Sequence, residues 1–89
     1  MAYSVELTRR AQKQLADLPA DLRRRIAARI DALAEQPRPA GAIKLQGFVN
    51  AWRLRVGDYR ILYEIQDQRL IVYVLRIGHR REIYRQPGS

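Results

Sequence analysis

The stretch AWRLRVGDYR (51–60) places three arginines within eight residues of a segment that otherwise reads as two β-strands and a turn. These arginines are Arg53, Arg55 and Arg60. A guanidinium group is planar, stays protonated and pairs bidentately with phosphate. A second basic group follows in HRREIY (79–84), where His79 and Tyr84 are better suited than arginine to moving a proton. These residue types indicate chemistry on a phosphate group.

Other reaction classes find no matching pattern in the sequence. There is no Ser-His-Asp or Cys-His arrangement, no convergent pair of carboxylates and no glycine-rich phosphate loop. Cleavage of RNA without a metal needs a base for the 2′-OH, positive charge around the phosphate, and an acid for the 5′-oxygen. Arginines supply the charge but transfer protons poorly. The sequence contains no cysteine and only one histidine, so we expect no metal and no other cofactor.

The arginines are positioned by a predicted hairpin. Gly57-Asp58, with glycine first, is typical of a two-residue type II′ turn, which sets Arg55 opposite Arg60. Because successive side chains of a strand point to opposite faces, the hairpin then has an apolar face and a face that carries the three arginines. The apolar face consists of Trp52, Leu54, Val56, Tyr59, Ile61 and Tyr63. Opposed like charges destabilise a sheet, so either the side chains extend into solvent or a phosphate binds between them.

The rest of the chain predicts an α+β fold. A strand at 3–7 precedes a helix from Arg9 to about Leu18, and Pro19 separates it from a second helix that continues to about Ala34. A connector follows to about Gly47. Three strands complete the fold, at 52–56, 59–65 and 70–77. We therefore predict one small domain, 1–89, of order β-α-α-β-β-β, with a mainly antiparallel twisted sheet and a helical hairpin packed on one face.

The last predicted strand, 70–77, is apolar at both odd and even positions except for Arg76, as in a central strand covered on both faces. We expect Gly78 to end this strand, so that His79 and Arg80 leave the sheet. The meander would bring residue 76 near Tyr59 and the hairpin turn. Arg80 and Tyr84 would then converge on the three arginines; the alternative is a solvated basic tail.

Charge is the strongest signal in the composition. Lys and Arg number 17 against nine Asp and Glu, a net charge of +8, and fifteen of the basic residues are arginine. This excess favours a polyanionic partner such as nucleic acid, although genomes of high GC content also enrich arginine. No apolar run is long enough to span a membrane and the N-terminus lacks a signal-peptide pattern, so we expect a cytoplasmic protein.

The motif R-x-R-x-G-D-Y-R-x-x-Y, followed downstream by H-R-x-x-x-Y, resembles the RelE branch of the RelE/ParE toxin superfamily, and the similarity extends over the whole chain. The resemblance implies a RelE-like fold and the toxin of a type II toxin–antitoxin pair. It implies a ribosome-dependent endoribonuclease that cleaves mRNA in the 30S A site by metal-free 2′-OH attack. The implied partners are a RelB-like antitoxin that wraps the toxin and masks the basic site, and operator DNA bound through the antitoxin.

The resemblance also implies roles for individual residues. Arg60 matches the arginine that stabilises the phosphate, Arg80 a general acid or charge stabiliser, and Tyr84 a tyrosine near the scissile bond. Arg53 and Arg55 occupy two basic strand positions that are lysines in some relatives. Since an arginine does not readily accept a proton, the base is left open between Tyr84 and the substrate itself. The implied RNA-binding residues are Lys44, His79 and Arg81.

Two alternative functions fit parts of the same pattern. A ParE-like toxin has a similar fold but inhibits DNA gyrase and lacks the ribonuclease residues; Arg60, Arg80 and Tyr84 together favour the RelE side. A non-catalytic module would hold nucleic acid on its basic face through phosphate contacts alone, with salt-sensitive, sequence-indifferent binding.

Overall fold

The computed structural model describes residues 2–79 of the chain. In chain order the elements are β1 (Ser4–Leu7), α1 (Arg9–Ala16), α2 (Ala20–Ala32), β2 (Ile43–Lys44), β3 (Ala51–Val56), β4 (Tyr59–Gln66) and β5 (Ile71–His79). The predicted order of a strand, a helical hairpin and three strands is confirmed, with the short strand β2 added. Both helices end two residues earlier than predicted. Neither has the length and apolar character that a helix across a membrane would need, a finding that covers the described residues.

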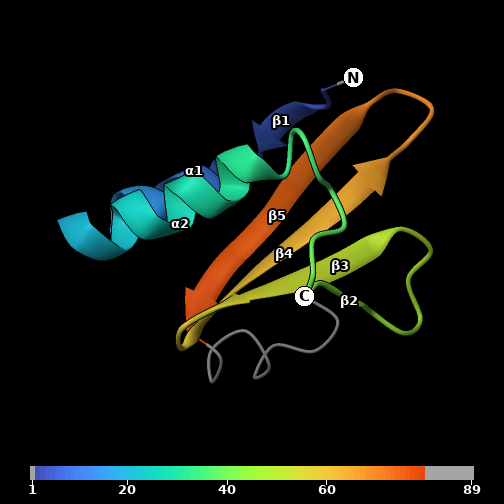
Figure 1. Ribbon diagram of the computed structural model, residues 1–89. Helices are drawn as coiled ribbons and strands as arrows, with labels where there is room; N and C mark the ends of the chain where they lie inside the picture. Colours follow the sequence, from blue (N-terminus) through green and yellow to red (C-terminus); the bar gives the residue numbers. More distant parts are fainter. Residues whose placement is uncertain (1, 80–89) are drawn as a thin grey trace.

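The strands form one sheet in the order β1-β5-β4-β3-β2. β3, β4 and β5 make the predicted antiparallel meander, and β2 pairs antiparallel with the outer edge of β3. β1 lies on the other side of β5 and runs parallel to it, with Ser4 opposite Ile71 and Leu7 opposite Val74. The two helices lie side by side next to β1 and β5 (Figure 1). The sheet is therefore mainly antiparallel, as predicted.

Thr8 joins the first strand, the first helix and β5. Its hydroxyl oxygen accepts a hydrogen bond from the backbone N–H of Ala11 at 3.0 Å, which caps the N-terminus of α1. The same hydroxyl donates to the carbonyl oxygen of Leu75 at 2.9 Å. Thr8 also donates its backbone N–H to Val74. One side chain thus fixes where β1 ends and how α1 leaves the sheet.

The core lies between the helices and one face of the sheet, here called the helix face. The helices contribute Ala11, Ile26 and Ile30, and Leu33 follows at the end of α2. The strands contribute Leu54, Val56, Ile61, Tyr63, Ile65, Val72, Val74 and Ile77, each at most 4 % exposed. The fully buried residues of the predicted apolar hairpin face all belong to this core. Burial of these side chains is the main source of stability.

The connector after α2 crosses the helix face over β3 and β4 (Figure 1). The hydroxyl of Tyr63 donates to the carbonyl oxygen of Pro37 at 2.8 Å, and burial raises the pKa of this tyrosine to about 12. Arg38 lies 5.4 Å above the ring of Trp52 and forms an ion pair with Asp67 at 2.7 Å. The connector is held by polar contacts at several points, although two prolines prevent regular structure there.

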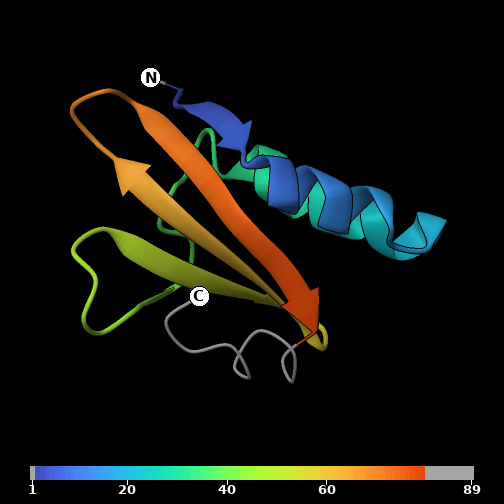
Figure 2. The same cartoon turned by 180° about the vertical axis from the view of Figure 1, so that it is seen from behind.

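The other face of the sheet, here called the open face, carries neither α1 nor α2, the two helices of the described residues (Figure 2). β5 has the predicted central position between β1 and β4, but the helices cover only one of its faces. A bulge interrupts its pairing with β4, because Tyr63 lies opposite Val74 whereas Leu62 lies opposite Arg76. Leu75 is therefore an extra residue, and the alternation of side chains reverses after it.

Candidate active site

The hairpin between β3 and β4 has the register that the sequence predicts. Val56 lies opposite Tyr59, Arg55 opposite Arg60 and Leu54 opposite Ile61. Gly57 has a φ of +61°, and Asp58 is not among the residues with positive φ. This is the conformation of a type II′ turn, which places glycine at the one position where an L side chain would be strained.

Three arginines, Arg53, Arg55 and Arg60, lie together on the open face and are called the arginine cluster. Arg55 and Arg60 are directly opposed across the strands, and Arg53 lies opposite Leu62. Arg55 is exposed, Arg53 is half-buried, and Arg60 is only 9 % exposed. The prediction that these residues share a face is confirmed by the register. The cluster is a concentration of positive charge on a face that neither α1 nor α2 covers.

Backbone carbonyl groups of the turn region accept hydrogen bonds from the cluster. Arg55 donates from Nε to the carbonyl oxygen of Gly57 at 3.1 Å, and Arg60 donates from Nη1 to that of Tyr59 at 3.3 Å. Carbonyl dipoles of this kind offset part of the repulsion between the opposed guanidinium groups. These contacts also orient the two side chains before any anion binds, which lowers the entropic cost of binding.

Gly78 lies opposite Arg60, within β5. The expectation that Gly78 ends the last strand is wrong, since β5 continues to His79 and both residues pair with β4. The expected approach of residue 76 to Tyr59 is also wrong, because His79 occupies that position and Arg76 lies opposite Leu62. A glycine opposite Arg60 leaves the neighbouring position on the open face without a side chain.

Two of the predicted RNA-binding residues lie on the helix face by register. His79 pairs with Tyr59, and the two rings meet edge to face at 5.6 Å and 82°. Lys44 lies opposite Trp52 at the outer edge of the sheet. The structure therefore does not bring His79 or Lys44 into the arginine cluster, and their role in RNA binding stays a prediction. Three further predicted residues, Arg80, Arg81 and Tyr84, lie outside the described residues.

Arg76 is a fourth arginine on the open face, and the sequence did not assign it to the site. It is 9 % exposed and lies next to Leu62, which separates it from Arg53 across the sheet. Burial and the nearby charge of Arg10 lower the pKa of Arg76. Its only signal in the sequence is that it interrupts an otherwise apolar run; the bulge at Leu75 that turns it to the open face has no sequence signature.

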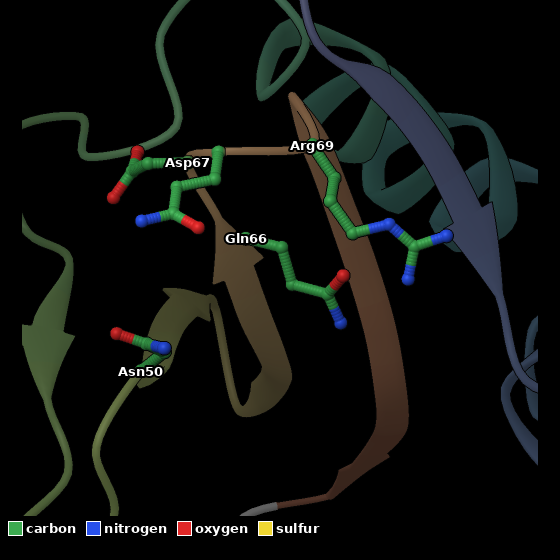
Figure 3. A pocket seen from close by; sticks show the side chains of 5 residues that line it. Asn50, Gln66, Asp67 and Arg69 are labelled. Carbon is green, nitrogen blue, oxygen red and sulfur yellow. The ribbon is translucent and has the colours of Figure 1, made fainter.

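A polar hollow of about 450 Å³ lies at the opposite end of the sheet, where β4 turns into β5 (Figure 3). It is lined by Asn50, Gln66, Asp67, Gln68 and Arg69. The carboxylate of Asp67 already accepts hydrogen bonds from Arg38 and Tyr3, both of which lower its pKa. The side chain of Gln66 donates to Glu64 at 2.8 Å. These groups stabilise the turn and supply no concentration of positive charge for phosphate.

The fold and the arginine cluster together define a small α+β protein whose open sheet face carries a cluster of arginines. Residues 5–84 match the family described as "ParE toxin of type II toxin-antitoxin system, parDE". This chain belongs to that toxin family, and its relatives place it in the RelE branch of the superfamily.

The relatives are similar along nearly their whole length. The chain is 33 % identical to Toxin RelG of Mycobacterium tuberculosis over 97 % of this chain and 100 % of RelG. It is 31 % identical to the mRNA interferase toxin RelE of Escherichia coli K12 over 94 % of this chain and 92 % of that protein. Among solved structures, the archaeal RelE–RelB complex from Pyrococcus horikoshii OT3 contains a chain with a TM-score of 0.80 and 30 % identity, covering 90 % of this chain and 97 % of that one.

Proposed function

We propose that this chain is a ribosome-dependent endoribonuclease that cleaves mRNA in the A site of the 30S subunit and so inhibits translation. The observation that carries the proposal is the arginine cluster, with the buried Arg60 opposed to Arg55 on the open face of a RelE-type fold. The name of the E. coli relative, mRNA interferase toxin RelE, supports RNA as the substrate. The reaction takes place in the cytoplasm, where the ribosome is.

The proposed reaction is attack by the 2′-OH on the adjacent phosphate without a metal ion. The 2′-oxygen loses its proton and forms a bond to phosphorus, while the bond to the 5′-oxygen breaks and that oxygen gains a proton. The products are a 2′,3′-cyclic phosphate and a 5′-hydroxyl. Negative charge grows on the phosphate oxygens during this step, and groups that are already oriented stabilise it most effectively.

Arg60 is the residue best placed for that role. The residue is only 9 % exposed, so its interaction with an anion is screened by water less than that of an exposed arginine. Arg53 and Arg55 add positive charge on the neighbouring strand and bind the phosphates on either side of the scissile bond. Arg80 and Tyr84 are proposed to complete the site, with Arg80 protonating or stabilising the leaving oxygen.

The proposed partner is a cognate antitoxin of the RelB type. Solved relatives were crystallised as RelE–RelB complexes, including the archaeal one. An acidic segment that covers the arginine cluster neutralises the toxin by charge complementarity and by excluding RNA. The toxin–antitoxin complex is proposed to bind operator DNA through the antitoxin.

The test is primer extension on mRNA translated in a purified system, with wild type, Arg60→Ala and Arg69→Ala. We expect cuts within codons that require translation, that vanish with Arg60→Ala, and that persist with Arg69→Ala, because Arg69 is exposed at the far end of the sheet. DNA damage without such cuts would instead indicate a ParE-like gyrase inhibitor.

A second pair of variants separates a nuclease from a binding module. We expect Tyr84→Phe and Arg80→Ala to lose cleavage while RNA binding is largely retained. A binding module would keep its function in both variants, since phosphate contacts elsewhere supply its affinity.

A further inference from the structure

Gln14 is a polar residue on the side of α1 that packs against the sheet. It follows Ala11 by three residues, and residues three or four apart lie on the same side of a helix. Ala11 is fully buried, and Gln14 is half-buried. A polar side chain on a packed helix face needs a hydrogen-bonding partner, because burial without one costs free energy. The partner of Gln14 lies on β5.

The side-chain oxygen Oε1 of Gln14 accepts a hydrogen bond from the backbone N–H of Ile77 at 2.7 Å. This contact lies where β1 no longer borders β5. The parallel pairing of these two strands ends with Leu7 opposite Val74, partway along β5, and α1 begins there (Figure 2). Among the described residues, the outer edge of β5 beyond Val74 therefore borders α1 and not a strand.

Two side chains, one before α1 and one within it, take over from β1 along this edge. Alternate residues of a strand direct their N–H and C=O groups away from an antiparallel neighbour, so these groups need partners on the outer edge. The hydroxyl of Thr8 donates to the carbonyl oxygen of Leu75 at 2.9 Å. Gln14 accepts from Ile77, two residues further along β5. Thr8 thus holds the bulge, and Gln14 holds the strand beyond it.

Packing restrains this end of β5 less than it restrains the centre of the strand, where Val72 and Val74 are fully buried. A hollow of about 300 Å³ lies between α1 and the end of β5, lined by Gln14, Asp17, Leu18, Tyr59, Ile77 and Gly78. Atoms that border a hollow have no packing partner on that side. Loss of the hydrogen bond to Gln14 would therefore leave the strand end room to move.

The position of this strand end matters because it borders the arginine cluster. Gly78 follows Ile77 and lies opposite Arg60, and the Cα atoms of opposed residues in an antiparallel pair are about 4.5–5.5 Å apart. His79 is the last residue of β5, and the chain continues from it to the two proposed catalytic residues downstream. A displacement at Ile77 therefore changes both the surroundings of Arg60 and the point from which those residues follow.

We propose that Gln14 is a positioning residue for the cleavage reaction, because its hydrogen bond from Ile77 fixes the end of β5 beside Arg60. The same bond fixes the origin of the segment that carries Arg80 and Tyr84. This role rests on the proposed function. Gln14 has no contact with the phosphate or the leaving oxygen in that reaction, so it acts on the rate through geometry. A misplacement of catalytic groups by about 1 Å can lower a rate about a hundredfold.

The variants Gln14→Leu and Gln14→Glu separate the hydrogen bond from the bulk of the side chain. Leucine and glutamate are both strong helix formers, but only glutamate keeps an oxygen that can accept from Ile77. Gln12→Leu is the matched control. Gln12 belongs to the same helix and donates from Nε2 to the carbonyl oxygen of Leu7 at 3.1 Å, so it contacts the end of β1 instead of β5.

Cleavage of mRNA on programmed ribosomes is measured in single turnover over a range of toxin concentrations. The maximal rate and the concentration that gives half-maximal cleavage are then obtained separately. Gln14→Leu should lower the maximal rate about 10- to 100-fold and change the half-maximal concentration less than about twofold, because the arginine cluster that binds RNA is unaltered. Gln14→Glu and Gln12→Leu should keep a maximal rate within about threefold of wild type.

Amide hydrogen exchange followed by NMR tests the anchoring of the strand end without any cleavage. The N–H of Ile77 should exchange at least about tenfold faster in Gln14→Leu than in wild type. The N–H of Ile65, which donates to Asn50 from a fully buried residue at the centre of the sheet, should keep its protection. Unchanged exchange at Ile65 distinguishes a local release of the strand end from a loss of global stability.

Several results would overturn the positioning role. They are a wild-type rate in Gln14→Leu, an equal loss of rate in Gln14→Glu, unchanged exchange at Ile77, and exchange at Ile65 that accelerates as much as at Ile77. The proposed function fails separately: a wild-type chain that leaves translated mRNA intact would refute the nuclease and the positioning role together. A wild type that cuts, with Gln14→Leu cutting equally well, would refute the positioning role alone.

Discussion

The opposed pair Arg55 and Arg60 gives a quantitative prediction about stability. Opposed like charges destabilise an antiparallel pair, and opposed unlike charges stabilise it, by about 0.2–1 kcal/mol in each case. Arg55→Glu replaces a pair of like charges with a pair of unlike charges, although it also loses the hydrogen bond from Arg55 to Gly57. Because Arg55 is exposed, we take the lower part of the range and expect a net gain of about 0.5 kcal/mol. For a domain of this size the melting temperature should rise by about 2–4 °C.

Arg53→Glu is the matched control, since Arg53 lies on the same strand and face but opposite Leu62. Both substitutions reduce the net charge equally, but only Arg55→Glu replaces a cross-strand pair of like charges with a pair of unlike charges. Thermal unfolding followed by circular dichroism at low and high salt measures the two variants, and the advantage of Arg55→Glu should shrink as salt is added. Both variants should cleave translated mRNA poorly. An equal rise in melting temperature for the two variants, or a fall for Arg55→Glu, would refute the idea that the cluster is maintained at a cost in stability.

Three further predictions concern the scaffold of the site. Thr8→Ala removes the helix cap and the bond to Leu75, so it should cost about 2 kcal/mol in urea unfolding, whereas Thr8→Ser should cost little. Leu54 is 1 % exposed, and Leu54→Ala should cost about 2–5 kcal/mol by leaving a cavity in the core, measured in the same way, with exposed Val49→Ala as a neutral comparison. Arg38 and Tyr3 lower the pKa of Asp67, so the stability from this contact is present above the ordinary carboxyl pKa and is lost as the pH falls through the lowered value. Asp67→Asn should therefore reduce the loss of unfolding free energy at acidic pH when stability is measured as a function of pH. An unchanged loss at acidic pH would contradict this.

The sequence predicts the hairpin closely because its signals are local. The Gly57-Asp58 pair determines the turn, the turn determines the register, and the register assigns the arginines to one face. The boundaries of the helices are predicted to within two residues, since Thr8 and Pro19 are local signals as well.

The features that were missed depend on tertiary contacts. β2 has only two residues, too few for any periodic pattern, and is defined by its pairing with β3. Because glycine weakens strands, the sequence predicts that Gly78 ends one, but its position opposite Arg60 in the ladder depends on β4. The bulge at Leu75 receives a hydrogen bond from Thr8, sixty-seven residues away in sequence, and without that bulge Arg76 would be assigned to the wrong face.

The structure also restricts the source of the base that the proposed reaction needs. Within residues 2–79, two carboxylates lie on or near the hairpin, Asp58 and Glu64. Glu64 is four residues along the strand from Arg60, which is about 13 Å, and its carboxylate accepts a hydrogen bond from Gln66. Asp58 is exposed in the two-residue turn, outside β3 and β4. His79 belongs to the helix face, against Tyr59.

For the proposed reaction, two further candidates remain for the base that would act on the 2′-OH beside Arg60. The segment that continues beyond His79 carries Tyr84, and the substrate bound to the ribosome supplies its own phosphate oxygens. The arginine cluster would bind and polarise the phosphate in either case, because a guanidinium group keeps its proton. Under the proposed function, a division of this kind would explain why the basic strand positions carry arginine in this chain: their contribution would be charge rather than proton transfer.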